Sequence, residues 1–249
     1  MSRGKVYIVG AGPGDAELLT IRAAKVLREA DLVLHDDLVS RDVLDCINSC
    51  AYVQNVGKRC GNKSTSQNEI NELMIQGARA GFMVARIKSG DPLIFGRAAE
   101  EIRALREAAV AFEIVPGVTS ALAAASALQI SLTERHVSSH VVLTTAHQVE
   151  GQSTSWTRVS RQDMTFVVYM PGSDYEKLQQ QLHEAGFAAD TPCAVISCAG
   201  LEDQSAVCAN VGELHRLQPL LAPSVVIVGE VCGAAAATAA AQIESMRVL

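Results

Sequence analysis

Glycine-rich and charged groups follow the apolar, strand-like segments of this 249-residue chain. Ligands of open α/β sheets bind outside the carboxyl ends of the strands, so these groups are expected to share one ligand site. Most of them lie in the first half of the chain. The groups occupy residues 10–15, 35–37, 57–59, 89–92, 116–120 and 170–172.

The first group, Gly10-Ala11-Gly12-Pro13-Gly14-Asp15, is not a dinucleotide fingerprint. Asp15 stands where the third glycine belongs and would repel a pyrophosphate, and Pro13 removes a backbone N–H. The glycines therefore predict either a tight strand-to-helix turn or a backbone approach to a ligand that need not be a phosphate. Asp36 and Asp37 follow the second strand as solvated carboxylates or as acceptors for a ligand hydroxyl.

Two further groups carry positive charge. Lys58 and Arg59 end the third strand, where they are suited to carboxylate binding or proton donation. In the stretch 89–97, Gly90 permits a close backbone approach, and Asp91 supplies an acceptor. Arg97 lies at the N-terminus of a helix, which favours anions and not cations, so its presence there indicates that it binds an anionic ligand.

Several classes of function are disfavoured. The six histidines and seven cysteines show no metal-ligand spacing, so no metal is expected and the thiols are expected to be reduced. Lys and Arg number 21 against 27 Asp and Glu, a net charge of −6, and aromatic residues make up 4%; both argue against nucleic-acid binding. No signal peptide or long apolar run is apparent, so we expect a cytoplasmic protein without membrane association.

Strand-like and helix-like segments alternate from end to end. This predicts an α/β fold with mainly parallel sheets, divided into domains 1–118 and 119–249. Thr20 is expected to cap one helix, and Ser66 with Glu69 forms a capping box for another. Further helices are expected near 98–109, near 176–185 and at the C-terminus. The predicted strands are 6–10, 32–34, 52–56, 83–87, 112–115, 140–144, 165–170, 193–197, 205–209 and 225–228.

Together these stretches resemble the tetrapyrrole (corrin/porphyrin) methylase family over nearly the whole chain. The resemblance implies two α/β domains with the active site in the cleft between them, S-adenosylmethionine as methyl donor, and a homodimer. The matching motifs are residues 9–15 with 18–20, 36–40, 56–59, 90–97 with Glu100 and Glu101, and 116–120.

The resemblance also assigns roles. Asp36 and Lys58 match the family's proton-transfer positions, and Arg97 and Glu100 fall where substrate meets methyl donor. Small departures from the family pattern at His35, Ser89, Ser120 and Ala199 are expected to affect the affinity for the methyl donor more than the reaction. Methyl-donor contacts are expected at Pro13, Ser89, Gly90, Asp91, Ile94, Thr119, Ser120, Met170 and Ala199.

Within the family, residues 36–40 and 57–59 are most similar to members that methylate uroporphyrinogen III at C2 and C7. The product would be precorrin-2, for siroheme, cobalamin or heme d1. The substrate has eight carboxylates, so charge-assisted bonds are expected from Lys58, Arg59, Arg97 and Arg135. Three alternatives stay open: a methylase of a later corrin precursor or of a protein or RNA, a nucleotide-binding oxidoreductase, and a non-catalytic regulator that binds S-adenosylmethionine or a tetrapyrrole.

Overall fold

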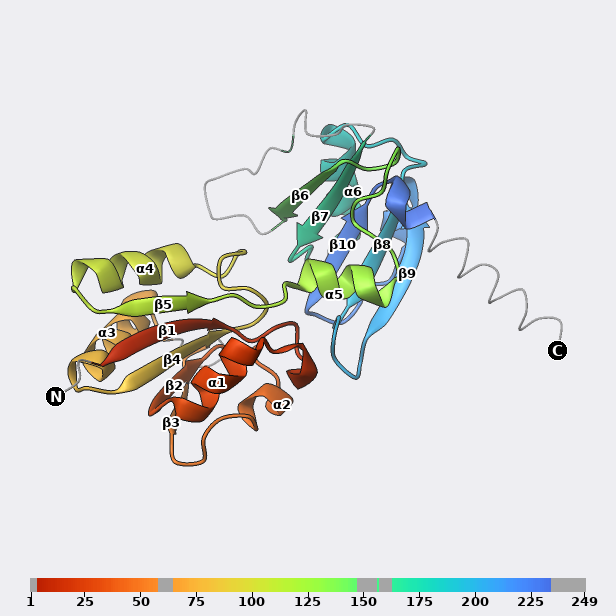
Figure 1. The fold of residues 1–249 in the computed structure, drawn as a ribbon. Coiled ribbons are helices and arrows are strands. Elements are labelled where there is room, and N and C mark those ends of the chain that lie inside the picture. The colour runs from red at the N-terminus through yellow and green to blue at the C-terminus, as the bar shows by residue number, and fades with distance from the viewer. Residues whose placement is uncertain (1–3, 58–64, 147–155, 157–162, 234–249) are drawn as a thin grey trace, which may run out of the picture. The chain divides into compact units, whose positions relative to one another are not determined.

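The computed structural model describes residues 4–57, 65–146, 156 and 163–233. The chain divides into two compact units, Met1–Ser120 and Ala121–Leu249 (Figure 1). Each unit is built on its own five-stranded sheet flanked by helices, which confirms the α/β class. In the described part of the chain, every helix is too short or too polar to span a bilayer.

The sheet of the first unit is entirely parallel, as predicted. Its strands run in the order β3-β2-β4-β1-β5, so β4 is the central strand. All five carboxyl ends therefore meet at one edge. The strands are β1 (Lys5–Gly10), β2 (Leu32–His35), β3 (Tyr52–Asn55), β4 (Met83–Lys88) and β5 (Phe112–Val115).

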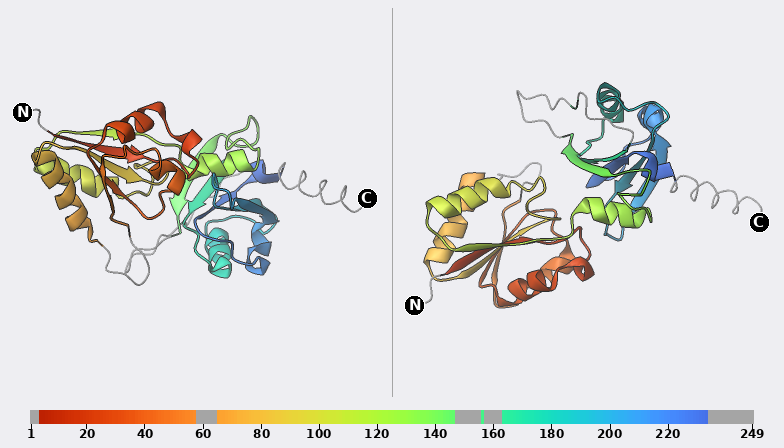
Figure 2. Two further views of the ribbon diagram at one scale, coloured as in Figure 1. Left: turned by 90° about the horizontal axis from the view of Figure 1, so that it is seen from below. Right: turned by 45° about the horizontal axis from the view of Figure 1, so that its top comes forward.

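Helices cover both faces of this sheet, because alternate strand residues are apolar on both sides. Ile8 packs against α3 (Gln67–Arg79) and α4 (Ala98–Glu107), and Val9 packs against α1 (Ile21–Glu29) and α2 (Arg41–Leu44). Figure 2 shows α3 and α4 on the face opposite α1 and α2.

The predicted helix starts in this unit are confirmed. The Thr20 hydroxyl accepts from the Ala23 N–H, and Ser66 and Glu69 form the reciprocal capping box. The turn that follows β1 contains a short 3-10 helix, η1 (Ala16–Leu18).

The sheet of the second unit differs from the expected mainly parallel arrangement. Its order is β6-β7-β10-β8-β9, and only β6 and β7 pair in parallel. Residues 198–204 join β8 directly to β9, and a parallel crossover needs about a dozen residues, so this pair is antiparallel. The strands are β6 (His140–Thr145), β7 (Met164–Tyr169), β8 (Pro192–Ser197), β9 (Ser205–Asn210) and β10 (Ser224–Val228).

The core of the second unit forms around Phe166, whose ring centroid lies 5.4 Å from that of Trp156 and 5.3 Å from that of Phe187. The sequence did not predict the alanine-rich α5, since its residues show no amphipathic spacing. The predicted C-terminal helix lies outside the described residues. The helical elements are α5 (Ser120–Ala127), α6 (Tyr175–Glu184), η2 (Val211–Arg216) and η3 (Glu230–Cys232).

Three glycines bring the loops after β1, β4 and β5 into direct backbone contact. A Cβ on Gly10 would lie 2.6 Å from the Gly117 nitrogen and 2.7 Å from the Gly90 oxygen. Gly90 itself has a left-handed φ of +69°, and its N–H donates to the Gly12 oxygen at 2.7 Å. The glycines at positions 10 and 117 are thus required by the packing of the loops on one another.

We expect Gly10→Ala to destabilise the first unit by about 1–3 kcal/mol, the usual cost of forcing atoms into a packed site. Thermal unfolding of the purified protein measures the loss. Gly233→Ala is the control, because its Cβ would meet no atom closer than the Pro192 Cγ at 4.0 Å. An unchanged melting temperature for Gly10→Ala would contradict the close contact.

Candidate active site

Two cations and a carboxylate are buried on one face of the first sheet. Arg86 and Lys88 alternate with apolar residues along β4 and are 1% and 3% exposed. Glu101, from the first turns of α4, is fully buried opposite them. Buried charges are costly unless they are paired, so each of these three groups is expected to contact a group of opposite charge.

One oxygen of Glu101 receives several hydrogen bonds. Its Oε1 accepts from Arg86 Nε and Lys88 Nζ, both at 2.9 Å, and from Gln67 Nε2 at 3.3 Å. Its Oε2 is buried and has no hydrogen-bond partner in the described structure. Elements β4, α3 and α4 thus meet at a single carboxylate.

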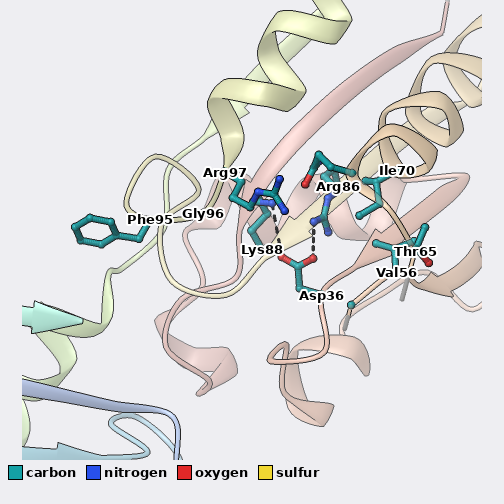
Figure 3. Close-up of a pocket in the computed structure, with 11 residues that line it drawn as sticks. Asp36, Val56, Thr65, Ile70, Arg86, Lys88, Phe95, Gly96 and Arg97 are labelled. Carbon is teal, nitrogen blue, oxygen red and sulfur yellow. Dashed lines mark hydrogen bonds and ion pairs between the residues drawn. The ribbon is translucent and has the colours of Figure 1, made fainter. Parts of the chain in front are cut away.

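The same two cations reach Asp36, which follows β2. Arg86 Nη2 donates to Asp36 Oδ1, and Lys88 Nζ lies 3.6 Å from Asp36 Oδ2 (Figure 3). The Asp36 side chain is 31% exposed, whereas the other three charged side chains are buried. Asp36 is therefore the solvent-accessible end of a row of four charged groups.

Asp36 faces a pocket of about 200 Å³ in the first unit. This volume lies below the roughly 300–1,000 Å³ of pockets for drug-sized ligands, so it fits a side group of a larger molecule. Arg86, Lys88 and Arg97 line it (Figure 3). Gly57 and Gln67 line it as well. Its walls offer both a carboxylate and cations to a ligand.

Arg97 lines this pocket and is paired with its neighbour Glu100. Its Nε and Nη2 each donate to a Glu100 oxygen at 2.8 Å. The hydrogen bond from Arg97 lowers the pKa of Glu100, and the same bond raises the pKa of Arg97. Both side chains are about half exposed. Arg97 and Phe95 also adopt left-handed φ angles of 57° and 51°.

Asp91 holds two loops together. Its Oδ1 accepts from the Leu93 N–H at 2.8 Å, and its Oδ2 accepts from the Gly117 N–H at 2.9 Å. Sequence reasoning interpreted Asp91 as a ligand acceptor and did not foresee these backbone contacts. A carboxylate has further lone pairs, so the two roles are compatible.

The remaining predicted methyl-donor positions of the first unit lie around Gly90. A Cβ on Gly90 would lie 3.9 Å from the Ser120 nitrogen and from the Thr119 Cα, so Gly90 is a close neighbour of these residues. Ser89 and Ile94 are half-buried. Pro13 is buried in the turn after β1, whose Gly12 pairs with Gly90.

In the second unit, Met170 and Ala199 lie at the same edge of the sheet. Met170 follows β7 and Ala199 follows β8; both strands run antiparallel to β10 between them and end beside its start. Met170 has a left-handed φ of 49° and is 46% exposed, so it is not a core residue. Arg135 is exposed in a turn near the start of β7, where Ser138 Oγ contacts Thr165 Oγ1 at 2.8 Å. Within this unit the structure does not bring Arg135 to Met170.

Lys58 and Arg59 lie outside the described residues. The preceding Gly57 packs directly on the loop after β2, because a Cβ there would overlap Asp37. That loop is also held by a hydrogen bond of 3.1 Å from Asn55 Nδ2 to Asp37 Oδ1. Gly57, the last described residue before Lys58, therefore lies beside Asp37.

Arg86 and Lys88 were not predicted as site residues from the sequence, and Glu101 was named there only as part of a family motif, without a role. Their signal is present in the sequence Met-Val-Ala-Arg-Ile-Lys, in which two cations two residues apart must share one face of a strand. Because the central strand of a parallel sheet is covered on both faces, these cations require a buried partner. The partner itself lies 15 residues from Arg86, on the covering helix.

The chain matches known proteins in both sequence and fold. Residues 5–215 match the model of the Tetrapyrrole (Corrin/Porphyrin) Methylases. A uroporphyrinogen-III C-methyltransferase of Pseudomonas aeruginosa is 44% identical over 231 residues, which cover 92% of this chain and 94% of the relative. A uroporphyrin-III C-methyl transferase of Thermus thermophilus, solved in complex with S-adenyl homocysteine, is 34% identical with a TM-score of 0.80, covering 92% and 98% of the two chains.

A siroheme synthase of Zymomonas mobilis is 42% identical over 93% of this chain but only 50% of its own length. This chain spans about half the length of the siroheme synthases that it matches. The match therefore concerns one part of those longer proteins.

We expect Arg97→Ala to raise the pKa of Glu100 toward its ordinary value, because the main cause of its lowering is lost. A carboxyl ¹³C NMR titration measures this change. Arg103→Ala is the control and should produce a smaller rise, since Arg103 acts on Glu100 only through weaker charge attraction. In the wild type, the lowered pKa implies stabilisation above the ordinary carboxyl pKa that is lost as pH falls, and solvent screening keeps it small. An unchanged Glu100 titration in Arg97→Ala would contradict the ion pair.

Proposed function

Because the chain belongs to the tetrapyrrole (corrin/porphyrin) methylases, we propose that it transfers methyl groups from S-adenosylmethionine to uroporphyrinogen III. The observation that carries this proposal is the 44% sequence identity to a uroporphyrinogen-III C-methyltransferase over nearly the full length of both proteins. Two transfers, to C2 and C7, give precorrin-2, a precursor for siroheme, cobalamin or heme d1.

The residues around Gly90 fit a methyl donor. The left-handed Gly90 has no side chain to cover its backbone, and it lies close to Thr119 and Ser120. The half-buried Ile94 adds an apolar contact. The family resemblance also assigns a methyl-donor contact to Met170, which is exposed in the second unit. S-adenosylmethionine, when bound, supplies an electrophilic methyl group on a positively charged sulfur.

The protein's own contribution to the chemistry is alignment and proton handling. A pyrrole carbon of the substrate is electron-rich enough to attack the methyl group, so holding the two in line is the principal task. Positive charge then develops on the pyrrole, and a proton must leave it. Asp36 is the carboxylate suited to accept that proton, directly or through water, because it faces the pocket and is partly exposed there, beside Arg86 and Lys88.

The substrate carboxylates call for cations at the mouth of the pocket. Arg97 presents five N–H donors, and its pair with Glu100 uses two of them, so the same guanidinium can also bind a carboxylate. Glu100 then orients Arg97. Gly57 lines this pocket, and Lys58 and Arg59 follow it in the sequence. We propose that Lys58 donates a proton or holds a propionate. The proposed role of Arg135 rests on the family resemblance alone.

The same resemblance supports two further parts of the proposal. We propose that the protein acts as a homodimer, which light scattering at micromolar concentration tests against the mass of a single chain. We also propose that it acts in the cytoplasm, where cell fractionation would find it.

The decisive experiment is anaerobic incubation with uroporphyrinogen III and S-adenosylmethionine, followed by mass analysis. The expected product carries two added methyl groups, and omission of the methyl donor is the control. Methylation of a later corrin precursor, with none of uroporphyrinogen III, would instead favour the alternative methylase. A melting-temperature shift with NAD but none with S-adenosylhomocysteine would contradict the proposal, since a ligand stabilises the fold that binds it.

We expect Met170→Ala to weaken S-adenosylhomocysteine binding several-fold with little loss of stability. The side chain is 46% exposed, so its truncation avoids the roughly 2–5 kcal/mol cost of emptying a core site. Calorimetric titration and thermal unfolding measure the two effects. Val141→Ala, which truncates a 37%-exposed side chain near the start of β6, is the control and should change neither. A large melting loss with normal affinity would contradict the assignment.

A further inference from the structure

Glu101 is fully buried and takes no direct part in the proposed reaction. Its environment is nevertheless more elaborate than a structural ion pair requires. One of its oxygens accepts hydrogen bonds from Arg86, Lys88 and Gln67, and all three of these side chains also line the pocket. Glu101 therefore lies directly behind the pocket wall.

Stability alone is a weak explanation for this arrangement. Apolar residues of similar volume commonly replace a buried ion pair without loss of stability. The cations, moreover, do not end at Glu101. Arg86 uses Nε for Glu101 and Nη2 for Asp36, and Lys88 lies between the same two carboxylates. Each cation thus connects a buried carboxylate to the partly exposed one.

We propose that Glu101 is a positioning residue that fixes Asp36 in its reactive orientation through Arg86 and Lys88. This inference rests on the proposed function, in which Asp36 accepts a proton. Glu101 anchors Nε of the Arg86 guanidinium, and Nη2 of the same rigid plane then sets where the Asp36 carboxylate lies. Glu101 also holds Lys88, whose flexible stem would otherwise turn its ammonium group into the pocket that it lines.

The test is a double-mutant cycle between Glu101→Gln and Asp36→Asn, measured as single-turnover methyl transfer at saturating substrates. Glu101→Gln alone is expected to slow transfer about 10- to 100-fold, in the range expected for a lost hydrogen bond between charged groups. The affinity for S-adenosylhomocysteine should stay within about twofold. In the Asp36→Asn background, Glu101→Gln should cause no further loss, because the group it positions is already absent.

Glu113→Gln is the matched control. Glu113 also accepts from two cations, Lys5 at 2.7 Å and Arg22 at 2.8 Å, but it lies on the edge strand β5. Its loss should leave methyl transfer unchanged. Equal slowing by Glu101→Gln in both backgrounds would overturn the proposal, as would a lower melting temperature with a normal rate.

If the Glu101→Gln variant does not fold, the double variant Lys88→Met with Glu101→Gln takes its place in the test. That variant removes one buried charge of each sign and so avoids an uncompensated cation. The same slowing is expected, again without further loss on Asp36→Asn. A normal rate in this pair would overturn the proposal.

Crystal structures of the wild type and Glu101→Gln test the positioning without any turnover. The Asp36 carboxylate is expected to leave Arg86 Nη2 in the variant, and an unmoved Asp36 would overturn the inference. This readout separates the two proposals. A displaced Asp36 in a protein that does not methylate uroporphyrinogen III would uphold the positioning of Asp36 and reject the proposed function.

Discussion

Two positive charges on the central strand of a sheet covered on both faces must be neutralised inside the protein. Arg86 and Lys88 impose this requirement, and its solution fixes several other elements. The helix α4 has to place Glu101 over β4, and the loop after β2 has to bring Asp36 within reach of the same cations. The pocket exists where these elements meet, and its one partly exposed carboxylate is oriented by groups that solvent does not reach.

A second constraint, steric in origin, holds the neighbouring loops. Gly10, Gly90 and Gly117 let three chain segments touch, and the Asp91 carboxylate ties two of them through the Gly117 N–H. The carboxyl-terminal edge of the first sheet is thus built by ion pairing on one face and by backbone contact between loops. Both kinds of contact hold side chains and backbone in place before a ligand arrives, which favours precise alignment of reacting groups.

Local patterns predicted the first unit well. The cap at Thr20 and the box of Ser66 and Glu69 depend on residues within one helical turn, so they can be recognised from sequence. The antiparallel pairing of the second sheet could not be recognised from sequence. There β10 inserts between β7 and β8, and no local residue pattern specifies which strands it pairs with. The ion pairs of Glu101 with Arg86 and Lys88 could not be predicted for the same reason, because these residues come together only once α4 covers β4. The ion pair of Arg97 with Glu100 is local, yet helix-dipole reasoning considered Arg97 without its neighbour.

In the turn that leads into α4, two residues that line the pocket have a backbone conformation that lowers the stability of the fold. Phe95 and Arg97 both occupy left-handed backbone, which costs roughly 1–2 kcal/mol for a residue with a side chain and almost nothing for glycine. Glycine at either position would relax the turn but remove a side chain from the pocket wall. Glycine at these two positions would thus trade pocket-lining side chains for a more relaxed backbone, and the melting temperature of such variants would be a poor guide to their activity.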